Sequence, residues 1–370
     1  MSSHCNPSVV DDGLVFLYDV EDIQSYKGEP TVNLAGSIVK RFSSWSGLTG
    51  TTEYYTTSSG DQGVKLVTTA SGGVQWYSFS TVYNIQASTQ YTISATVKYT
   101  GGTPHPNLLY VRQYDGNGQT SESGKFTTAN VRDLGGGWKR IWRTFTTDST
   151  TTHINLQGYE YTTGKTIYIQ DLQFELKSHA TQFAGVSTTR SSTQGLIDRT
   201  GSSTIDISDA SFDSNAQMTF DGTDDYLDCG DMGISSSKVT FAAWIKFSGS
   251  STEHIIDASG NTCHLAILSG NKPYFYNGST YHTGADTITN GVWYYLTGVQ
   301  SDTNDIYING VLSNSINSNV NISVSTVNIG RWQSGGRYFN GDIASARIYN
   351  RALTAEEVLQ NYNATKSRFQ

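Results

Sequence analysis

Carboxylates are the densest group of potential metal ligands in this sequence, since five of them fall within eleven residues. They are Asp221, Asp224, Asp225, Asp228 and Asp231. Hard oxygen ligands at this density suit Ca²⁺. Asp-Gly and Thr-Asp-Asp are also ordinary turn sequences, because short acidic side chains accept hydrogen bonds from nearby backbone N–H groups. Two alternatives result: a structural calcium site at Asp221, Asp224 and Asp225, or a solvated turn without an ion.

Carboxylates could also hydrolyse a glycosidic bond, which takes two of them about 5 to 9.5 Å apart. The nearest pair along one predicted strand is Asp171 and Glu175 in the sequence IQDLQFEL. Four residues along a strand separate side chains by roughly 13 Å, which is too far for such a pair. The sequence contains no serine nucleophile motif and no glycine-rich phosphate loop. It therefore predicts that the protein is not an enzyme.

Histidine and cysteine do not show the spacing of metal ligands. The scattered histidines include His105, His153, His179, His254, His264 and His282. We expect them to be solvated or buried in the core. The cysteines are Cys5, Cys229 and Cys263. They cannot all pair within one chain, and none lies in a Cys-x-x-Cys motif. Reduced, buried thiols are expected, which favours folding in a reducing cytoplasm.

Aromatic side chains near turns are the best candidates for ligand binding. A sugar ring stacks its apolar face on Trp or Tyr while nearby amides bond to its hydroxyl groups. The candidates of this kind are Tyr114, Tyr159, Tyr161, Tyr276, Tyr281, Trp332 and Tyr338. Aromatic residues are also enriched at protein interfaces, so these side chains contact either a glycan or a neighbouring subunit. The tryptophans that lie in strand patterns and are expected in the core are Trp138, Trp142, Trp244 and Trp293.

The elements that must position these side chains are almost all strands. Gly (37 residues) and Tyr (23) are abundant, Pro (5) is scarce and charged residues make up only 15%, which is typical of β proteins with many short strands. Alternation and turn signals predict strands over 12–22, 63–69, 74–83, 90–100, 107–118, 138–147, 153–161, 165–176, 195–201, 216–230, 238–249, 253–259, 263–269, 272–282, 292–300, 304–315, 325–332 and 343–349. The dipeptide Asn309-Gly310 predicts a type I′ hairpin. The fold class is all-β, with two β-sandwich domains of the jelly-roll type.

One short helix is expected, close to the C-terminus. Thr354 lies three residues before Glu357, which is the spacing of a capping box at a helix start. The next residues place Val358, Leu359 and Tyr362 on one apolar face. We expect this helix to lie against the last sandwich and close it, which is a structural role.

Charge and hydropathy exclude two classes of partner. The formal net charge is −8 and neither Lys nor Arg forms a run, so no nucleic-acid partner is expected. No apolar stretch approaches about 18 residues, so no membrane insertion is expected. The N-terminal sequence MSSHCNPSVVDDG has neither the basic head nor the apolar centre of a secretory signal.

The second half of the chain resembles a laminin G-like, concanavalin A-like jelly roll. The sequences FDGTDDYLDCG, TFAAWIKF, GVWYYLTGVQSDTNDIYINGVL and FNGDIASARIYNRALTAEEVLQNYNA carry this resemblance, in that order. The resemblance implies a β-sandwich closed by a short helix after the last strand. Glucanases of this fold have an ExDxE or ExDxxE pattern on one strand, and this sequence has none.

The first strand of such a domain matches GLVFLYDVED at 13–22, far upstream of the rest. The sequence between them resembles a carbohydrate-binding module through GGWKRIWRTFTT and TIYIQDLQFE. This implies a discontinuous sandwich, 12–39 plus 179–370, with a second jelly roll inserted at 40–178 and an N-terminal arm at 1–11. Insertion is physically easy at a surface loop. In many such modules an acidic residue near the last strand can ligate a structural calcium, and Asp171 matches this residue. The alternative is that Asp171 is a plain surface aspartate.

The same chain looks like proteins of tailed-phage virions. The matching segments are DGLVFLYD, DLQFELKSHATQF, STTRSSTQGLIDRTG, FDGTDDYL and IYNRALTAEEVLQNYNATKSRF. The resemblance implies a protein on the virion surface, with other virion proteins and host surface glycans as partners, assembled as a homo-oligomer. One hypothesis is a tail fibre or surface appendage that adheres to glycans; many weak sites then act together. The alternative is a capsid decoration or tail component whose sandwiches contact only proteins. A polysaccharide depolymerase is disfavoured by the missing carboxylate pattern.

Overall fold

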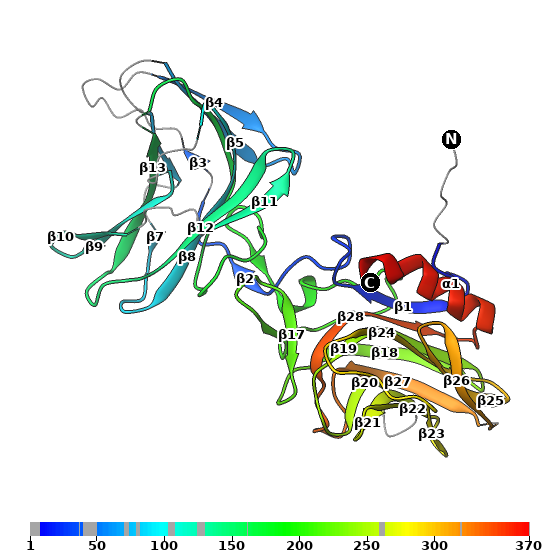
Figure 1. Cartoon of the computed structure of the whole chain (residues 1–370). Helices are drawn as coiled ribbons and strands as arrows, with labels where there is room; N and C mark the ends of the chain where they lie inside the picture. The colour runs from blue at the N-terminus through cyan, green and yellow to red at the C-terminus, as the bar shows by residue number, and fades with distance from the viewer. Residues whose placement is uncertain are drawn as a thin grey trace, which may run out of the picture. The chain divides into compact units, whose positions relative to one another are not determined.

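The chain folds into two compact units in the computed structural model (Figure 1). The structure describes residues 8–36, 38–39, 50–69, 74–78, 82–102, 108–123, 130–160, 162–258, 263–318 and 320–369. Unit 1 comprises Met1–Pro30, Ser191–Asp213 and Gln217–Gln370, and unit 2 comprises Thr31–Arg190 and Ser214–Ala216. The main division falls after residues 30 and 190, whereas the boundaries expected from the sequence fall after residues 39 and 178.

Unit 1 is a sandwich of two antiparallel sheets, with layers that can be followed in Figure 1. The eight-stranded sheet has the order β16 (Ser211–Phe212), β17 (Met218–Asp221), β28 (Asn340–Tyr349), β19 (Val239–Phe247), β24 (Trp293–Gln300), β25 (Thr303–Ile308) and β26 (Val311–Asn317), with β1 (Leu14–Asp19) paired to β28. The six-stranded sheet has the order β18 (Leu227–Ser236), β27 (Ile322–Ile329), β20 (Glu253–Ala258), β21 (Cys263–Leu268), β22 (Lys272–Tyr276) and β23 (Tyr281–Thr283).

The core of unit 1 lies between these two sheets. Alternation along β19 shows how the sequence selects the faces: Phe241, Ala243 and Ile245 enter the core, while Ala242 and Trp244 lie on the opposite face. Successive side chains of a strand point to opposite sides. Both faces of β19 are buried because another layer covers the outer one.

That layer is helix α1 (Ala355–Thr365), followed by a 3₁₀ turn, η3 (Lys366–Arg368). The predicted capping box is confirmed, because Thr354 Oγ1 accepts the Glu357 N–H at 3.3 Å and Glu357 accepts the Thr354 N–H at 2.9 Å. The indole of Trp244 donates to Thr365 Oγ1 at 2.7 Å. Leu359, expected on the buried face, is 42% exposed. Val358 is buried as expected, and the Tyr362 ring packs on Trp244 with ring centroids 5.7 Å apart. The polar side chains of Asn361 and Thr365 are buried as well, because the surface beneath the helix offers them hydrogen-bonding partners.

The predicted hairpin in unit 1 is confirmed. Asn309 and Gly310 join β25 to β26, with φ values of 53° and 81°. Positive φ at both central positions is what a type I′ turn requires. The segment 195–201, predicted as a strand, instead forms only isolated bridges, including Tyr26 with Leu196.

Unit 2 contains two further six-stranded antiparallel sheets and a two-stranded one. The first has the order β10 (Gly118–Ser123), β9 (Tyr110–Asp115), β13 (His153–Glu160), β6 (Val74–Ser78) and β3 (Ile38–Val39), with β7 (Val82–Tyr83) paired to β13. The second has the order β11 (Val131–Gly135), β12 (Trp138–Thr146), β8 (Gln90–Thr100), β14 (Thr166–Glu175), β5 (Gln62–Thr68) and β4 (Gly50–Thr56). The two-stranded sheet pairs β15 (Thr189–Arg190) with β2 (Thr31–Val32), and the 3₁₀ turn η1 (Ser192–Gln194) begins the return to unit 1.

The core of unit 2 follows the alternation in its central strand. Tyr91, Ile93 and Ala95 of β8 are buried in it. Trp138 and Trp142, expected in the core, are only half-buried. They share a face of β12, but the core face of that strand carries the intervening Ile141, so the tryptophans point away from it.

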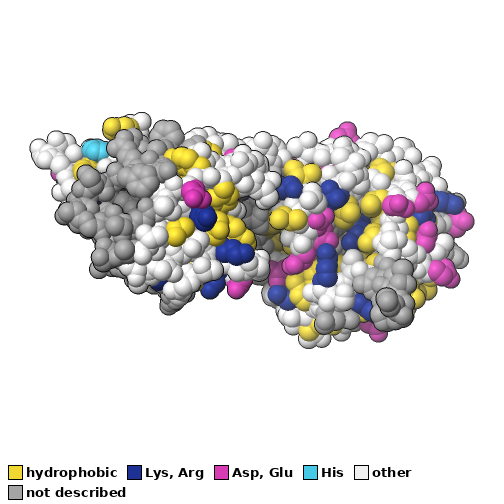
Figure 2. Space-filling model, turned by 90° about the horizontal axis from the view of Figure 1, so that it is seen from above, with side chains coloured by type: hydrophobic (Ala, Val, Ile, Leu, Met, Phe, Trp, Pro, Cys, Tyr) yellow, Lys and Arg dark blue, Asp and Glu magenta, His cyan; other side chains and the backbone are white. Residues whose placement is uncertain are grey.

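The all-β fold class is therefore confirmed, and α1 is the α-helix found in the described part of the chain. Among these residues no helix is long and apolar enough to cross a membrane. Two of the cysteines, Cys229 and Cys263, are buried free thiols as expected, while Cys5 lies outside the described residues. On the face shown in Figure 2, basic and acidic side chains are interspersed and form no large field of one sign.

Candidate functional site

A row of polar and aromatic side chains crosses the outer face of the six-stranded sheet in unit 1. In register from β27 to β23, the row consists of Asn328, Asp257, His264, Tyr276 and Tyr281. Side chains opposite one another on adjacent strands share a face and touch. Their strand neighbours, such as Leu265 and Phe275, belong to the core on the other face. We call these five residues the outer row.

The aromatic end of the outer row is a stack of rings. The His264 and Tyr276 ring centroids lie 4.8 Å apart and those of Tyr276 and Tyr281 lie 4.4 Å apart, with rings inclined by about 30° or less. Tyr276 is buried, whereas Tyr281 is 56% exposed. The stack therefore presents one tyrosine ring to solvent on a rigid support.

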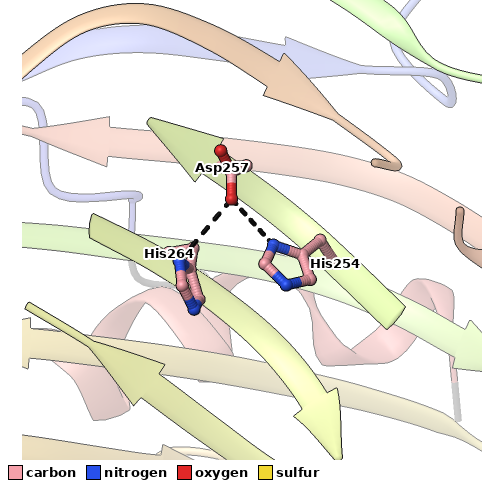
Figure 3. Close-up of side chains that lie close together, drawn as sticks. All are labelled: His254, Asp257 and His264. Atoms are coloured by element: carbon pink, nitrogen blue, oxygen red, sulfur yellow. Dashed lines mark hydrogen bonds and ion pairs between the residues drawn. The ribbon is translucent and has the colours of Figure 1, made fainter. Parts of the chain in front are cut away.

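The polar end of the outer row meets His254, which precedes Asp257 by three residues on β20. Figure 3 shows both imidazoles directed at the Asp257 carboxylate. His254 Nδ1 lies 2.7 Å from Asp257 Oδ2, and His264 Nδ1 lies 3.6 Å from the same oxygen. Each of the three residues offers a ligand atom within 4.8 Å of the others.

A β-bulge explains how His254 and Asp257 come to share a face. Residues three apart in a regular strand point to opposite sides. The pairing of β20 with β21 shifts between His254 and Ile256, so one extra residue, Ile255, is accommodated there. A bulge of this kind re-aims the side chains beyond it.

Burial determines the electrostatics of this cluster, because all three side chains are fully buried. Burial lowers the pKa of His254 and of His264 well below the usual range, and it raises the pKa of Asp257. The nearby Arg337 guanidinium further lowers the pKa of His254. Both imidazoles are therefore neutral near pH 7, the form in which histidine binds metal ions.

Several polar atoms of this region lack a hydrogen-bonding partner among the described residues. They include the two ring nitrogens of His264 and the indole nitrogen of Trp332. An unmade hydrogen bond of a buried polar group costs about 1–3 kcal/mol. Such groups call for an explanation, and a bound ligand is one.

A second aromatic stack lies in unit 2. Tyr83 of β7 and Tyr114 of β9 flank His153 of β13 in register. His153 stacks on Tyr114 with centroids 5.1 Å apart, and Tyr83 lies 5.6 Å from His153 on its other side. Tyr83 is 67% exposed. The sequence predicted Tyr114 as a candidate but missed Tyr83.

The structure brings some of the predicted aromatic residues together and leaves others apart. Tyr276 and Tyr281 are stacked, and Trp332 lies close by, with its ring 6.4 Å from that of His254. Tyr338 lies half-buried beyond Trp332 in the same loop. The predicted side chain of Tyr159 and the whole of Tyr161 lie outside the described residues.

The two predicted calcium positions belong to different compact units. Asp221, Asp224 and Asp225 have carboxylate oxygens within 4.8 Å of one another in unit 1. Asp171 belongs to unit 2, where it occupies a bulge of β14 with φ of 53° and accepts a hydrogen bond from Gln170. The structure tests neither position, so calcium at Asp171 and calcium at the Asp221 turn both stay predictions.

Hydrogen bonds inside the Asp221 turn account for part of its geometry. Asp221 Oδ1 accepts the N–H of Thr223 at 2.7 Å, and Asp225 Oδ2 accepts the N–H of Asp221 at 2.7 Å. The Thr223 hydrogen bond lowers the pKa of Asp221, and burial raises the pKa of Asp225. Both alternatives, a turn or a calcium site, remain compatible with this arrangement.

The Asp171–Glu175 pair is occupied by structural contacts. The buried Glu175 carboxylate accepts hydrogen bonds from Thr31 at 2.6 Å and from Thr181 at 2.7 Å and 2.9 Å. A carboxylate satisfied in this way is held as a structural acceptor in unit 2 and is not available to protonate a substrate.

Unit 1 also contains a cavity of about 170 Å³ on the eight-stranded sheet. Its lining includes Tyr26, Trp293, Lys246 and Asp342. The last two form an ion pair of 2.6 Å, and the Lys246 ammonium lies over the Trp293 ring. Trp293, expected in the core, is half-buried because it lies at this cavity.

Sequence reasoning missed the cluster of His254, Asp257 and His264. A weak signal was present, because EHIIDA and CHLAIL are apolar strands interrupted by titratable residues. Charged side chains and histidines in buried strands are uncommon unless they have partners. The sequence does not show which of them meet.

Comparison with known proteins adds the fold family of part of the chain. Residues 221–359 match the model of the concanavalin A-like lectin/glucanases superfamily, which confirms the concanavalin A-like jelly roll expected in this half. No curated protein matched the sequence.

Solved structures similar to part of the chain belong to diverse proteins. One is domain 4 of AbnA, a GH43 extracellular arabinanase from Geobacillus stearothermophilus, in complex with arabinotriose (21% identity, 39% of this chain, 75% of that chain, TM-score 0.34). Another is a SAP-like pentraxin from Limulus polyphemus (20% identity, 38% of this chain, 78% of that chain, TM-score 0.31). A third is the ligand-binding domain of botulinum neurotoxin serotype D in complex with N-acetylneuraminic acid (14% identity, 48% of this chain, 50% of that chain, TM-score 0.38).

Proposed function

We propose that this chain is a non-enzymatic glycan-binding protein, a tail fibre or surface appendage of a phage virion that attaches to glycans of the host surface. The observation that carries glycan binding is the exposed ring of Tyr281, held on the stack of Tyr276 and His264. Stacking on a fixed aromatic ring is how proteins bind the apolar face of a sugar. The match of residues 221–359 to a lectin-containing superfamily supports this choice.

The proposal that the chain is not an enzyme rests on the carboxylate near the Tyr281 platform and on the Asp171–Glu175 pair. Glycoside hydrolysis takes a pair of them about 5 to 9.5 Å apart. Asp257 is the one carboxylate among the five described residues of the outer row, and imidazoles lie next to it. The outer row therefore does not supply the second carboxylate that hydrolysis would need. Glu175 in unit 2 is engaged in structural hydrogen bonds.

The virion setting and assembly as a homo-oligomer rest on the sequence resemblance. A homo-oligomer would present several Tyr281 platforms side by side. Weak sites presented in this way gain effective affinity without new contacts.

The test is binding of the purified chain, presented multivalently, to a glycan array and to host cells. Tyr281→Ala should weaken binding about tenfold, since stacking of rings is worth roughly 1 kcal/mol or more. Tyr281→Phe keeps the ring and should retain most binding. Tyr54→Ala removes an exposed tyrosine (43%) outside both stacks and serves as the control.

Each outcome decides between functions. Binding unaffected by Tyr281→Ala would refute this site. Binding to no glycan or cell would favour the alternative, a capsid decoration or tail protein with only protein contacts. Release of sugar fragments from a bound glycan would refute the non-enzymatic role.

A further inference from the structure

We propose that His254, Asp257 and His264 form a binding site for a divalent first-row transition-metal ion, such as Zn²⁺. The three residues come from two adjacent strands, β20 and β21, and converge on one point of the outer face (Figure 3). Their ligand atoms lie within 4.8 Å of one another. Nothing in this proposal depends on glycan binding.

The donor set fits this class of ion. Imidazole nitrogen suits zinc and its neighbours in the first transition series, while calcium and magnesium take oxygen ligands. Two imidazoles and one carboxylate supply three ligands, which is the number that zinc sites with an open position use. The ligands stand on paired strands, so their separation is set by the sheet.

The groups around the ligands leave the correct atoms available. Asp257 Oδ1 accepts the backbone N–H of Gln333 at 3.3 Å, so Oδ2 is the oxygen that faces the imidazoles. His254 Nε2 lies 3.2 Å from the hydroxyl of Tyr274. When Nδ1 of a histidine binds a metal, its other nitrogen typically donates to such an oxygen, which fixes the orientation of the ring.

A simple buried ion pair does not explain why His264 is buried with both ring nitrogens unbonded in the described part of the chain. Hydrogen bonding accounts for His254 and Asp257, which are 2.7 Å apart. His264 is fully buried, and neither of its ring nitrogens has a hydrogen-bonding partner among the described residues. A metal ion on the Asp257 side would use the lone pair of one of these nitrogens.

Besides Arg331, which also acts on Asp257, Arg337 is a charged group that faces the cluster from the neighbouring loop. Its Nη1 lies 3.4 Å from His254 Nε2 and its guanidinium lies over the ring of Trp332. This cation opposes the binding of a metal cation. Arg337 is exposed, so its side chain can turn into solvent when an ion enters. Arg337→Gln should therefore raise the metal affinity several-fold.

The experiment is isothermal titration of the full, chelator-treated chain with Zn²⁺, with Co²⁺ as an absorbing substitute. A single ion per chain is expected. His264→Phe keeps an aromatic ring that can stack on Tyr276 but removes both nitrogens. It should weaken Zn²⁺ binding by at least about 100-fold, because loss of a group that only hydrogen-bonds to a metal ligand already lowers metal affinity about 10- to 100-fold. His153→Phe is the matched control, because His153 also stacks on a tyrosine and should bind as the parent does.

Three results would overturn the proposal. They are no Zn²⁺ binding by the parent chain, unchanged affinity in His264→Phe, and a comparable loss in His153→Phe. If His264→Phe does not fold, X-ray absorption of the Zn²⁺-loaded parent chain decides, because the site must show two imidazoles and a carboxylate. A different ligand set refutes it. Failure here leaves the Tyr281 result intact, since Tyr281→Ala is scored by glycan binding alone.

Discussion

Replacement of Asn361 by alanine should loosen the attachment of helix α1. Asn361 is fully buried; its Oδ1 accepts the N–H of Val10 at 2.8 Å and its Nδ2 donates to the hydroxyl of Tyr349 at 3.0 Å. That hydroxyl donates to the carbonyl of Val10 at 3.0 Å. One side chain therefore joins the helix to the last strand and to the N-terminal segment.

The size of the effect can be worked out from these contacts. A hydrogen bond contributes about 1 kcal/mol, and a buried donor left without an acceptor costs about 1–3 kcal/mol. Asn361→Ala removes two hydrogen bonds and leaves the Val10 N–H without its acceptor, so we expect a loss of about 2–4 kcal/mol. Each 1.4 kcal/mol is a factor of ten, so this corresponds to a roughly 30- to 700-fold change in the opening equilibrium.

Hydrogen–deuterium exchange of peptides from α1, read by mass spectrometry, measures this equilibrium locally. Local reading is needed because the chain has two compact units and need not unfold in a single step. Asn363→Ala is the matched control, since it makes the same change on the same helix at a half-buried position, and it should shift the free energy by about 0.5 kcal/mol or less. Equal acceleration of exchange in the two variants would refute this account of the helix.

Two further predictions concern pH and calcium. Arg351 donates two hydrogen bonds to Glu357, at 2.7 and 2.8 Å, and these lower the pKa of the Glu357 carboxyl below its usual 4.5. The pair therefore stabilises the folded state at pH values above the pKa of Glu357 in the unfolded chain. This stabilisation is lost as the pH falls through the lower pKa of the folded state. Both side chains are about a quarter exposed, so the ion pair contributes less than about 1 kcal/mol to stability. Between pH 6 and pH 3 the melting temperature should fall less steeply in Glu357→Gln than in the parent chain. Parallel curves of melting temperature against pH would contradict this. Calcium at Asp221, Asp224 and Asp225 stays a prediction. A Ca²⁺ concentration about 100 times the dissociation constant should stabilise the chain by about 2.7 kcal/mol, and Asp224→Asn should abolish this stabilisation. A melting temperature that changes with neither Ca²⁺ nor a chelator would leave a turn without an ion as the explanation.

Local sequence patterns were enough wherever the deciding interactions lie within a few residues. Thr354 and Glu357 cap each other across three positions, and Asn309-Gly310 adopts the positive φ values of its turn. The core face of strands such as β8 agrees directly with period-two alternation. These features depend on backbone geometry and on neighbours along the chain, which the sequence contains directly.

The sequence predicted less well which face of an element is covered. Trp142 sits in a strand pattern, yet it lies on the outer face of its strand, and Leu359 of the apolar helix face is exposed. Periodicity identifies two faces but not the element that packs against each of them. Trp244 is buried on the outer face of β19 because α1 and Phe369, which follows it, lie over it.

The candidate metal cluster depended entirely on tertiary structure. His254 and Asp257 share a face only because Ile255 is bulged, and His264 joins them only through the register of β20 with β21. A bulge inserts one residue and reverses the facing of the later residues in the strand, so alternation read from the sequence assigns these side chains wrongly. The sequence alone determined that the chain is a β protein closed by one capped helix. Pairing register, a property of contacts between strands, decided which polar side chains meet.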